Sequence, residues 1–353
     1  MVGCRLQTCH IQRNSVVKSQ GNRTTISDVA KAAKTGKTSV SRYLNGEQHL
    51  LSDALKLRIE TAIRQLNYNP SQMARSLKKG RTKLIGIIIA DITNPYSVDV
   101  LRGVEDACQQ HGFTLLMCNT NNEVDQEQHY LELFSSYCVE GIVVNAVGMR
   151  EDAFAKLQHS LLPMVLIDRK IAGLSCDMIG LDNQGATIAA TNHLIEQGFE
   201  AFLFLSEPLG LVNTRQERLQ AFQQTIQRNP PLIACHYDIR LSDTEQLDKI
   251  LYDFCQRHRG MRKAAISANG AMTLQIARAM RRLRLNWGSD MGLLGFDEME
   301  WAEVAGITTL KQPTYQIGRA ALEQLISRIN GDARPNAEKT FPGTLIVRES
   351  TIR

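Results

Sequence analysis

Residues 24–46 read TTISDVAKAAKTGKTSVSRYLNG, and this stretch decides how the amino-terminal part of the chain folds. Thr25 and Asp28 are residue types that cap helix starts, and small apolar residues follow them at helical spacing. A short break at Lys34–Gly36 precedes a second helix that begins near Thr38. Two short helices joined by a tight turn are typical of a helix-turn-helix, whose second helix reads base edges in the major groove of DNA. An ordinary helical hairpin on a protein surface is the alternative.

The second helix presents a polar face suited to base edges. Val40 and Leu44 are spaced to face inward, while four polar residues face outward. A lysine or arginine can donate to guanine O6 and N7, and a threonine can bond a base or touch a thymine methyl group. The candidate DNA-reading residues are therefore Lys37, Thr38, Ser41 and Arg42.

A third helix closes a small apolar core. Leu55, Ile59, Ile63 and Leu66 repeat at helical spacing after Ser52, which we expect to cap this helix. The basic segment 70–83 follows. A helix this short is largely unfolded in water, so we expect a hinge that becomes helical only when DNA and a partner chain order it. A plain basic linker is the alternative.

Charge is divided unevenly along the 353 residues. Residues 1–83 contain 16 Lys and Arg against 4 Asp and Glu, a net charge of +12, whereas the whole chain carries only +5. The remainder is therefore acidic. A basic head on an acidic body fits a polyanion as the partner of the head alone.

The cysteines and the apolar runs bound the cellular setting. Eight cysteines are scattered without a C-x-x-C pair, which indicates reduced thiols in a cytoplasmic protein. Cys4, Cys9 and His10 lie close in sequence, but without a fourth partner they are weak evidence for a metal, and we expect no metal and no cofactor. We expect no membrane span, because no apolar run is long enough. Residues 1–23 are basic and polar, and we expect a disordered extension rather than a secretory signal.

From Leu84 onward, short apolar runs alternate with amphipathic helical segments. The runs include LIGIIIA at 84–90, AFLFLS at 201–206 and MGLLGF at 291–296. Such strands indicate parallel sheets covered on both faces, and two series in succession indicate two doubly wound α/β subdomains. Ligands bind beyond the carboxyl ends of such strands, so a cleft between the subdomains is the expected ligand site. We expect residues 335–353 to form one final strand.

Several motifs occur together in one order along the chain. They include LNYNPSQMARSL at 66–77, RLQAF at 218–222, SANGAMTLQIARAM at 267–280 and LLGFDEME at 293–300. With the helix-turn-helix stretch, they make roughly residues 24–350 resemble the lactose-repressor/purine-repressor (LacI/GalR) family of bacterial transcription factors. The resemblance implies an all-α headpiece and a core similar to periplasmic sugar-binding proteins, which closes over a small molecule between its two subdomains.

The resemblance also implies domain boundaries. We expect a helix-turn-helix domain at 24–69, a hinge helix or linker at 70–83 and a core at 84–353. The chain would pass repeatedly between the two core subdomains. The first would comprise 84–183 and 313–340, and the second 184–312 and 341–353.

Carried over by position, the resemblance implies two sets of functional residues. Leu77 falls where paired hinge helices push a leucine wedge into the minor groove. Such a wedge unstacks a base step, and the bent DNA then contacts more protein surface. Its expected neighbours are Met73, Ala74 and Lys78. The main effector-contacting positions are Arg218, Asn269 and Asp297, and the weaker candidates at strand ends are Asp91, Asn94, Tyr96 and Asp168. A guanidinium and a carboxylate together suit a polyol or sugar-like ligand. The alternative for each is an internal salt bridge or a satisfied strand-end group.

The chain departs from the family pattern at two places. Lys34-Thr35-Gly36 stands where family headpieces usually have Gly-Val-Ser, which removes the cap hydroxyl of the second helix and adds a cation. Gly270 stands where Asp commonly follows Asn269. From that missing carboxylate we hypothesise an anionic effector, such as a sugar acid or a sugar phosphate, because the repulsion near Arg218 is reduced.

These features together predict a cytoplasmic, sequence-specific transcriptional regulator, most simply a repressor, that binds a near-palindromic operator as a homodimer. Its small sugar-like or sugar-acid effector would bind between the core subdomains. A solute-binding protein without DNA function is one alternative. A nucleotide-using enzyme is another, although neither G-x-G-x-x-G nor G-x-x-x-x-G-K-[ST] occurs. The sequence leaves open the effector, the operator bases, and whether the effector releases or promotes DNA binding.

Overall fold

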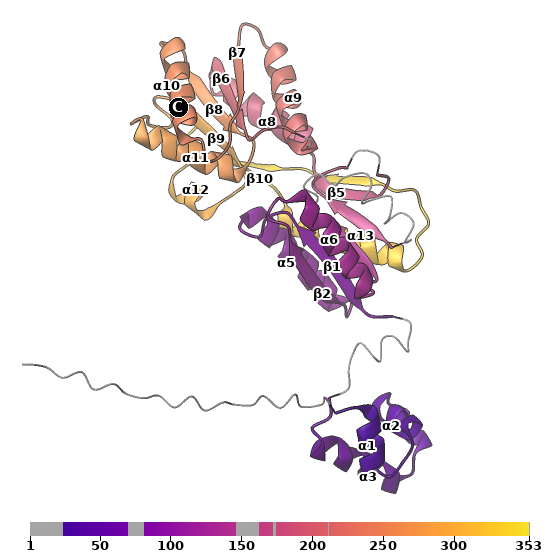
Figure 1. Cartoon of the computed structure of the whole chain (residues 1–353). Helices are drawn as coiled ribbons and strands as arrows, with labels where there is room; N and C mark the ends of the chain where they lie inside the picture. Colours follow the sequence, from indigo (N-terminus) through magenta and orange to yellow (C-terminus); the bar gives the residue numbers. More distant parts are fainter. Residues whose placement is uncertain (1–23, 70–80, 146–161, 172–173, 211, 353) are drawn as a thin grey trace, which may run out of the picture. The chain divides into compact units, whose positions relative to one another are not determined.

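The computed structural model describes residues 24–69, 81–145, 162–171, 174–210 and 212–352 of the chain (Figure 1). The chain divides into two compact units, residues 1–80 and 81–353. The expected extension at 1–23 and most of the expected hinge, residues 70–80, lie outside the described residues.

The first unit is a small helical domain. It contains α1 (Ile26–Ala32), α2 (Lys37–Leu44), the short 3-10 helix η1 (Gln48–Leu50) and α3 (Asp53–Gln65). Val29, Val40 and Ile59, one residue from each main helix, are completely buried in its core. Ser52 occupies the capping position of α3 as expected, but its side chain makes no capping hydrogen bond, so that expectation was wrong in its chemistry.

The second unit contains two six-stranded sheets with corresponding strand orders. The first sheet has the order β11-β5-β4-β3-β1-β2 and the second has the order β12-β10-β9-β8-β6-β7. Neighbouring strands are parallel except for β12, which runs antiparallel to β10. The strands of the first sheet are β1 (Leu84–Ile89), β2 (Thr114–Asn119), β3 (Gly141–Val144), β4 (Met164–Ile167), β5 (Asp177–Leu181) and β11 (Glu338–Phe341). Those of the second are β6 (Ala201–Ser206), β7 (Ile233–Asp238), β8 (Lys263–Ser267), β9 (Gly292–Phe296), β10 (Thr308–Lys311) and β12 (Thr344–Ile346). This confirms two parallel-sheet α/β subdomains, which we call the first and the second lobe.

Helices cover both faces of each sheet. In the first lobe, α5 (Pro95–Gln110) and α13 (Thr314–Ile329) pack on one face and α6 (Val124–Ser136) on the other. In the second lobe, α10 (Thr244–Arg257) and α11 (Gly270–Arg282) pack on one face, and α8 (Asn183–Glu196) and α9 (Asn213–Gln227) on the other. The short α12 (Glu300–Val304) precedes β10. Among the described helices none is long and apolar enough to cross a membrane.

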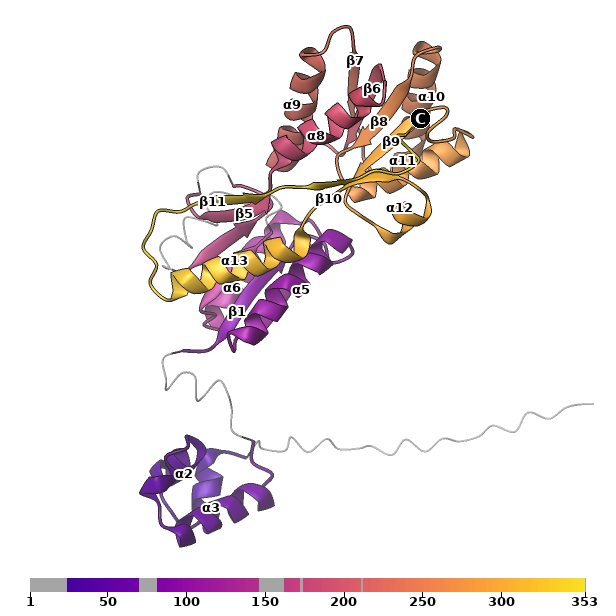
Figure 2. The same ribbon diagram turned by 180° about the vertical axis from the view of Figure 1, so that it is seen from behind.

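The chain passes between the lobes three times. It leaves the first lobe after β5, returns between β10 and α13, and leaves again between β11 and β12 (Figure 2). The expectation of one final strand over 335–353 was therefore wrong. This segment forms two short strands because β11 pairs with β5 in one sheet and β12 with β10 in the other. Both strands are only three or four residues long, so apolar patterning alone does not separate them.

The pair α5 and α13 is packed unusually closely (Figure 2). A Cβ atom added at Gly103 would lie 2.1 Å from the carbonyl oxygen of Tyr315, and one added at Gly318 would lie 2.1 Å from that of Val100. The two glycines therefore allow the helix backbones to touch. Because α13 follows the second crossover, this contact fixes the returning chain to the first lobe.

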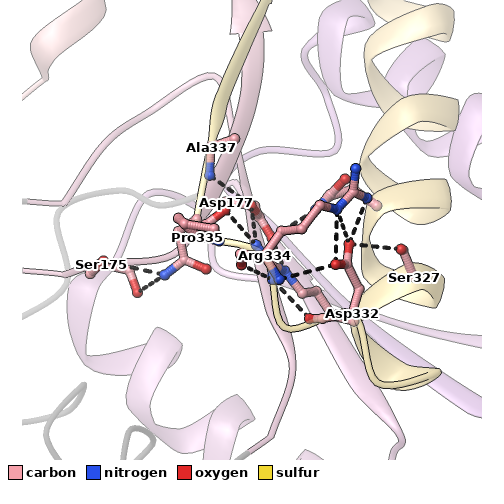
Figure 3. A network of polar contacts seen from close by, with 10 residues as sticks. Ser175, Asp177, Ser327, Asp332, Arg334, Pro335 and Ala337 are labelled. Atoms are coloured by element: carbon pink, nitrogen blue, oxygen red, sulfur yellow. Dashed lines mark hydrogen bonds and ion pairs between the residues drawn. The ribbon is translucent and has the colours of Figure 1, made fainter.

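A network of charged groups closes the far end of α13 (Figure 3). Asp177, whose side chain is 1% exposed, accepts two hydrogen bonds from Arg328 and one each from Gln324 and the backbone N–H of Ala337. Burial alone would raise the pKa of Asp177, but these donors outweigh it and hold the pKa below its ordinary value. The network therefore joins the start of β5 to α13 and to the segment entering β11.

We expect Asp177→Asn to lower the stability of the protein at pH 7 by about 3 kcal/mol, because Arg328 is left without its buried partner. The folded pKa of Asp177 lies below the unfolded one, so its stabilisation is complete above the ordinary carboxyl pKa of about 4 and disappears as the pH falls below it. Urea midpoints of parent and variant should converge in acid. Glu323→Gln, which removes a half-exposed partner of Arg319, is the control. A difference between parent and Asp177→Asn that persists unchanged at low pH would contradict this role.

Candidate DNA-reading helix and candidate effector site

The helix α2 presents the residues that the sequence singled out. Lys37, Thr38 and Arg42 are exposed, and Ser41 is half-buried and accepts a hydrogen bond from Asn45. The buried residue of this helix is Val40, and Thr38 and Arg42 are turned furthest from it. Two cations and two hydroxyls thus share one accessible face. The expected hinge residues Met73, Ala74, Leu77 and Lys78 lie outside the described residues.

The turn before α2 carries a strained lysine. Lys34 has a φ of 50°, and its N–H bonds to the carbonyl of Lys31 while that of Thr35 bonds to the carbonyl of Ala30. This is the Schellman motif, in which glycine is the usual residue at the position of Lys34. Gly36 occupies the capping position of α2 and has no side chain, so α2 begins without a side-chain capping hydrogen bond.

Within the second unit, residues of both lobes line a cavity of about 480 Å³. A cavity of this volume suits a small metabolite. All seven effector candidates lie on its wall: Asp91, Asn94, Tyr96 and Asp168 from the first lobe, and Arg218, Asn269 and Asp297 from the second. We call it the interlobe cavity.

The topology of the sheets explains why these side chains meet. In each sheet the strand order reverses beside the first strand, and polar residues follow the strand ends at that edge. Asp168 directly follows β4, and Asp297 directly follows β9, its counterpart in the second sheet. Both have a positive φ, 65° and 71°, and both donate their N–H to the neighbouring strand. The two lobes therefore present equivalent carboxylates to one cavity.

Arg218 is held rigidly by its surroundings. The side chain is buried, donates from Nε to Asn183 and from Nη1 to the carbonyl of Ala268, and lies 4.2 Å from the ring of Phe296. Among the described residues Nη2 has no partner. Two-point binding of a ligand by this guanidinium is therefore restricted, because one side of it is already used by the protein.

The two equivalent carboxylates differ in how they are paired. Asp297 accepts from the N–H of Gly270 at 2.9 Å and from Nε2 of Gln312 at 2.6 Å. Oδ1 of Asp168, in contrast, is buried and has no hydrogen-bond partner. Burial raises the pKa of Asp168, although Arg218 and Arg169 oppose that shift. Asp297 thus has a structural role, whereas Asp168 is the carboxylate available to a ligand.

Two more buried polar atoms without a partner lie on the same wall. They are the hydroxyl of Tyr96 and Oε1 of Gln312, whose residues are 8% and 5% exposed. Burial, together with the charges of Asp168 and Asp297, raises the pKa of Tyr96, which keeps its hydroxyl protonated. An unpaired buried polar atom costs free energy, so three of them beside one cavity indicate a polar ligand.

Gly270 stands where the neighbouring side chains of Met299 and Asp297 leave no space for a Cβ atom, so its role is steric as well as electrostatic. A Cβ atom at this position would lie 2.6 Å from Cε of Met299 and 3.2 Å from Oδ2 of Asp297. An aspartate here would therefore displace Met299 and crowd a second carboxylate. For this reason Gly270→Asp cannot test effector charge in isolation.

Among the other polar residues of the cavity wall, sequence reasoning did not single out Asn145, Glu207, Arg215 and Gln312. Asn145 and Glu207 directly follow β3 and β6, so the rule of polar strand ends could have found them. Arg215 lies one helical turn before Arg218. Gln312 lies in a crossover that no sequence pattern marks.

A second polar group raises the question of enzyme chemistry. Ser206, His236 and Asp238 lie together at the ends of β6 and β7, but the serine and the carboxylate both contact Nε2 of the histidine, at 3.4 and 2.7 Å. A nucleophilic relay needs the carboxylate and the hydroxyl on opposite ring nitrogens. This triangle is therefore not arranged as such a relay.

Comparison with known proteins places both units in one class. Residues 25–71 match the bacterial regulatory proteins of the lacI family, and residues 191–351 match a periplasmic binding protein-like domain. The chain is 46% identical over 343 residues to the HTH-type transcriptional regulator PtxS of Pseudomonas aeruginosa, covering 96% of this chain and 98% of that protein. It is 36% identical over 337 residues to the regulator KdgR of Bacillus subtilis, with 94% and 99% covered. The crystal structure of the lac repressor dimer bound to operator and the anti-inducer ONPF has the same fold, with a TM-score of 0.78, 21% identity, and 94% and 99% covered.

The fold and the cavity define a ligand-controlled DNA-binding regulator with a helix-turn-helix domain and a periplasmic-binding-protein-like core. The chain belongs to the lacI family of bacterial regulatory proteins. It is accordingly a sequence-specific transcriptional regulator. The relatives are regulators that match along almost their whole length, DNA-binding domain included, which leaves the solute-binding alternative without support.

We expect Lys34→Gly to stabilise the helical domain by about 1 kcal/mol, because glycine adopts a positive φ without steric cost. Asn67→Gly is a matched control, since Asn67 has a φ of 45° at the equivalent position after α3 and asparagine tolerates it better than lysine. Hydrogen exchange of peptides from 26–44 in the full-length protein measures the effect. A gain for Lys34→Gly no larger than that for Asn67→Gly would refute the strain at Lys34.

We expect the equivalent substitutions Asp168→Asn and Asp297→Asn to differ in the free energy of unfolding. Asp297→Asn should cost about 1–3 kcal/mol, because it disturbs two buried donors. Asp168→Asn should cost nothing at pH 7 or stabilise the protein, since a carboxyl with a raised folded pKa is destabilised when ionised. Urea unfolding at pH 7 measures both. Equal losses would show that Asp168 is as structural as Asp297.

Proposed function

We propose that this regulator is a cytoplasmic homodimeric repressor that binds a near-palindromic operator and is controlled by a small polyhydroxylated acid in the interlobe cavity. Two identical helices α2 would read two half-sites, as two-fold symmetry requires. Lys37, Thr38, Ser41 and Arg42 would make the base contacts, and the segment with Met73, Ala74, Leu77 and Lys78 would contact the centre of the operator.

The observation that carries the effector proposal is the set of partnerless atoms on the cavity wall. Oδ1 of Asp168 and Oε1 of Gln312 are acceptors, so they call for a ligand that donates, and hydroxyl groups do so. The guanidinium groups of Arg215 and Arg218 on the same wall supply positive charge, and a carboxylate or phosphate is the anion that binds guanidinium best. A sugar acid or sugar phosphate combines both.

The same residues suggest how the effector controls DNA binding. Asp168 and Tyr96 belong to the first lobe and Arg218 to the second, so a ligand that contacts all three favours one angle between the lobes. The first lobe continues directly from the segment 70–83. Effector binding would thus shift the population of interlobe angles and with it the fit of the paired hinges to the operator. We propose that the ligand is bound and released unchanged, which its recovery intact after prolonged incubation would test.

The first test is selection of random duplexes by the full-length protein at moderate salt, where contacts to phosphate alone are suppressed. We expect an enriched palindrome with a flexible central step, and sedimentation of the complex as two chains on one duplex. No enrichment, with or without added metabolite mixtures, would contradict the proposed operator binding.

On the selected duplex we expect Arg42→Ala to weaken binding by about 1–3 kcal/mol and to relax the preference at one base pair of each half-site. Arg64→Ala is the control, because Arg64 is an exposed arginine on α3 that pairs with Glu60. Fluorescence anisotropy with the selected duplex and its single-base variants measures both. Uniform weakening across all sequences by Arg42→Ala would assign Arg42 to a phosphate contact instead.

A further inference from the structure

Glu207, which directly follows β6, is bonded to two donors of the cavity wall. Its Oε2 accepts from Nδ2 of Asn269 at 2.7 Å and from Nη2 of Arg215 at 2.8 Å. Its other oxygen, Oε1, makes no hydrogen bond within the described part of the chain. A single carboxylate oxygen thus accepts hydrogen bonds from both an amide and a guanidinium, and both of these groups line the cavity.

The two donors are held in place independently of Glu207. Arg215 also donates from Nη1 to the carbonyl of Pro208, and Asn269 accepts from the N–H of Met272 as the cap of α11. An amide and a guanidinium fixed in this way form a ready site for a carboxylate. Glu207 is 24% exposed in its side chain, so it can turn toward water without opening the core.

A nearby anion stabilises the half-buried charge of Arg215. Burial lowers the pKa of Arg215 and the positive charges of Arg169 and Arg218 act in the same direction, while Glu207 opposes the shift. A ligand without charge cannot replace Glu207 in stabilising the charge of Arg215. A ligand with an acid group can.

We propose that Glu207 is a specificity-determining residue, whose carboxylate competes with the acid group of the effector for Arg215 and Asn269. The inference rests on the proposed effector site and deepens it by placing the acid group beside α9 and the start of α11. A neutral polyol does not enter this competition, because it leaves the pair of Glu207 and Arg215 intact. Glu207 therefore lowers the affinity for an acid and leaves that for the matching neutral polyol unaffected.

The test is calorimetric titration of the full-length protein with matched six-carbon ligands that differ only at one end, aldonates and the corresponding alditols, beginning with D-gluconate and D-glucitol. The variants are Glu207→Gln, which keeps the shape and removes the charge, and Arg215→Gln. The control is Glu245→Gln, which removes the same charge from the exposed Glu245 of α10, a residue that does not line the cavity.

We expect Glu207→Gln to bind the aldonate about tenfold or more tightly than the parent, with the alditol changed less than about threefold. Arg215→Gln should lose the preference for the acid, and Glu245→Gln should resemble the parent. Weaker aldonate binding by Glu207→Gln, or an equal gain for both ligands, would overturn the competition while leaving the effector site standing. Binding of no aldonate or alditol by any variant would refute the proposed effector site and this inference with it.

Discussion

The carboxylate of Asp297 joins the parts of the core on which control depends. It binds the first N–H of α11 and the side chain of Gln312, the residue just before the chain returns to the first lobe. Both contacts are buried, so breaking either leaves a polar group without water. Asp297 thus connects the wall of the cavity to the crossover through hydrogen bonds. A ligand that moves the wall therefore moves the connection between the lobes.

The two lobes present carboxylates at equivalent positions, but these carboxylates are hydrogen-bonded differently. Asp168 and Asp297 follow corresponding strands with similar backbone angles, yet one is saturated by protein donors and the other retains a buried oxygen without a partner. The second lobe thereby carries a preformed half of the site, with Arg218 fixed over Phe296. The first lobe carries the half with unsatisfied polar atoms, Tyr96 and Asp168. In our proposal, a ligand would complete hydrogen bonding chiefly on the first lobe, which is the one that continues from the segment 70–83.

The sequence was sufficient to predict the fold and to select residues that line one cavity. Helical spacing and apolar runs predicted the helix-turn-helix and two parallel-sheet subdomains, because burial patterns follow directly from period. The seven effector candidates do share one cavity wall, although their function stays a prediction. What sequence did not reveal depends on long-range pairing. The antiparallel pairing of β12 with β10, the saturation of Asp297 by Gln312 and the bond of Glu207 to Asn269 all join residues distant in sequence, and no local pattern records them.

The most direct test of the link between cavity and DNA is the affinity of the full-length protein for its selected operator with and without a saturating sugar acid that is shown to bind. We expect the acid to change operator affinity by at least about fivefold, in either direction, as is typical of coupled sites. The change should vanish in Arg218→Ala, and we expect this variant to bind the operator as the parent does without the acid. An acid that binds the core tightly yet leaves operator affinity unchanged would contradict the coupling.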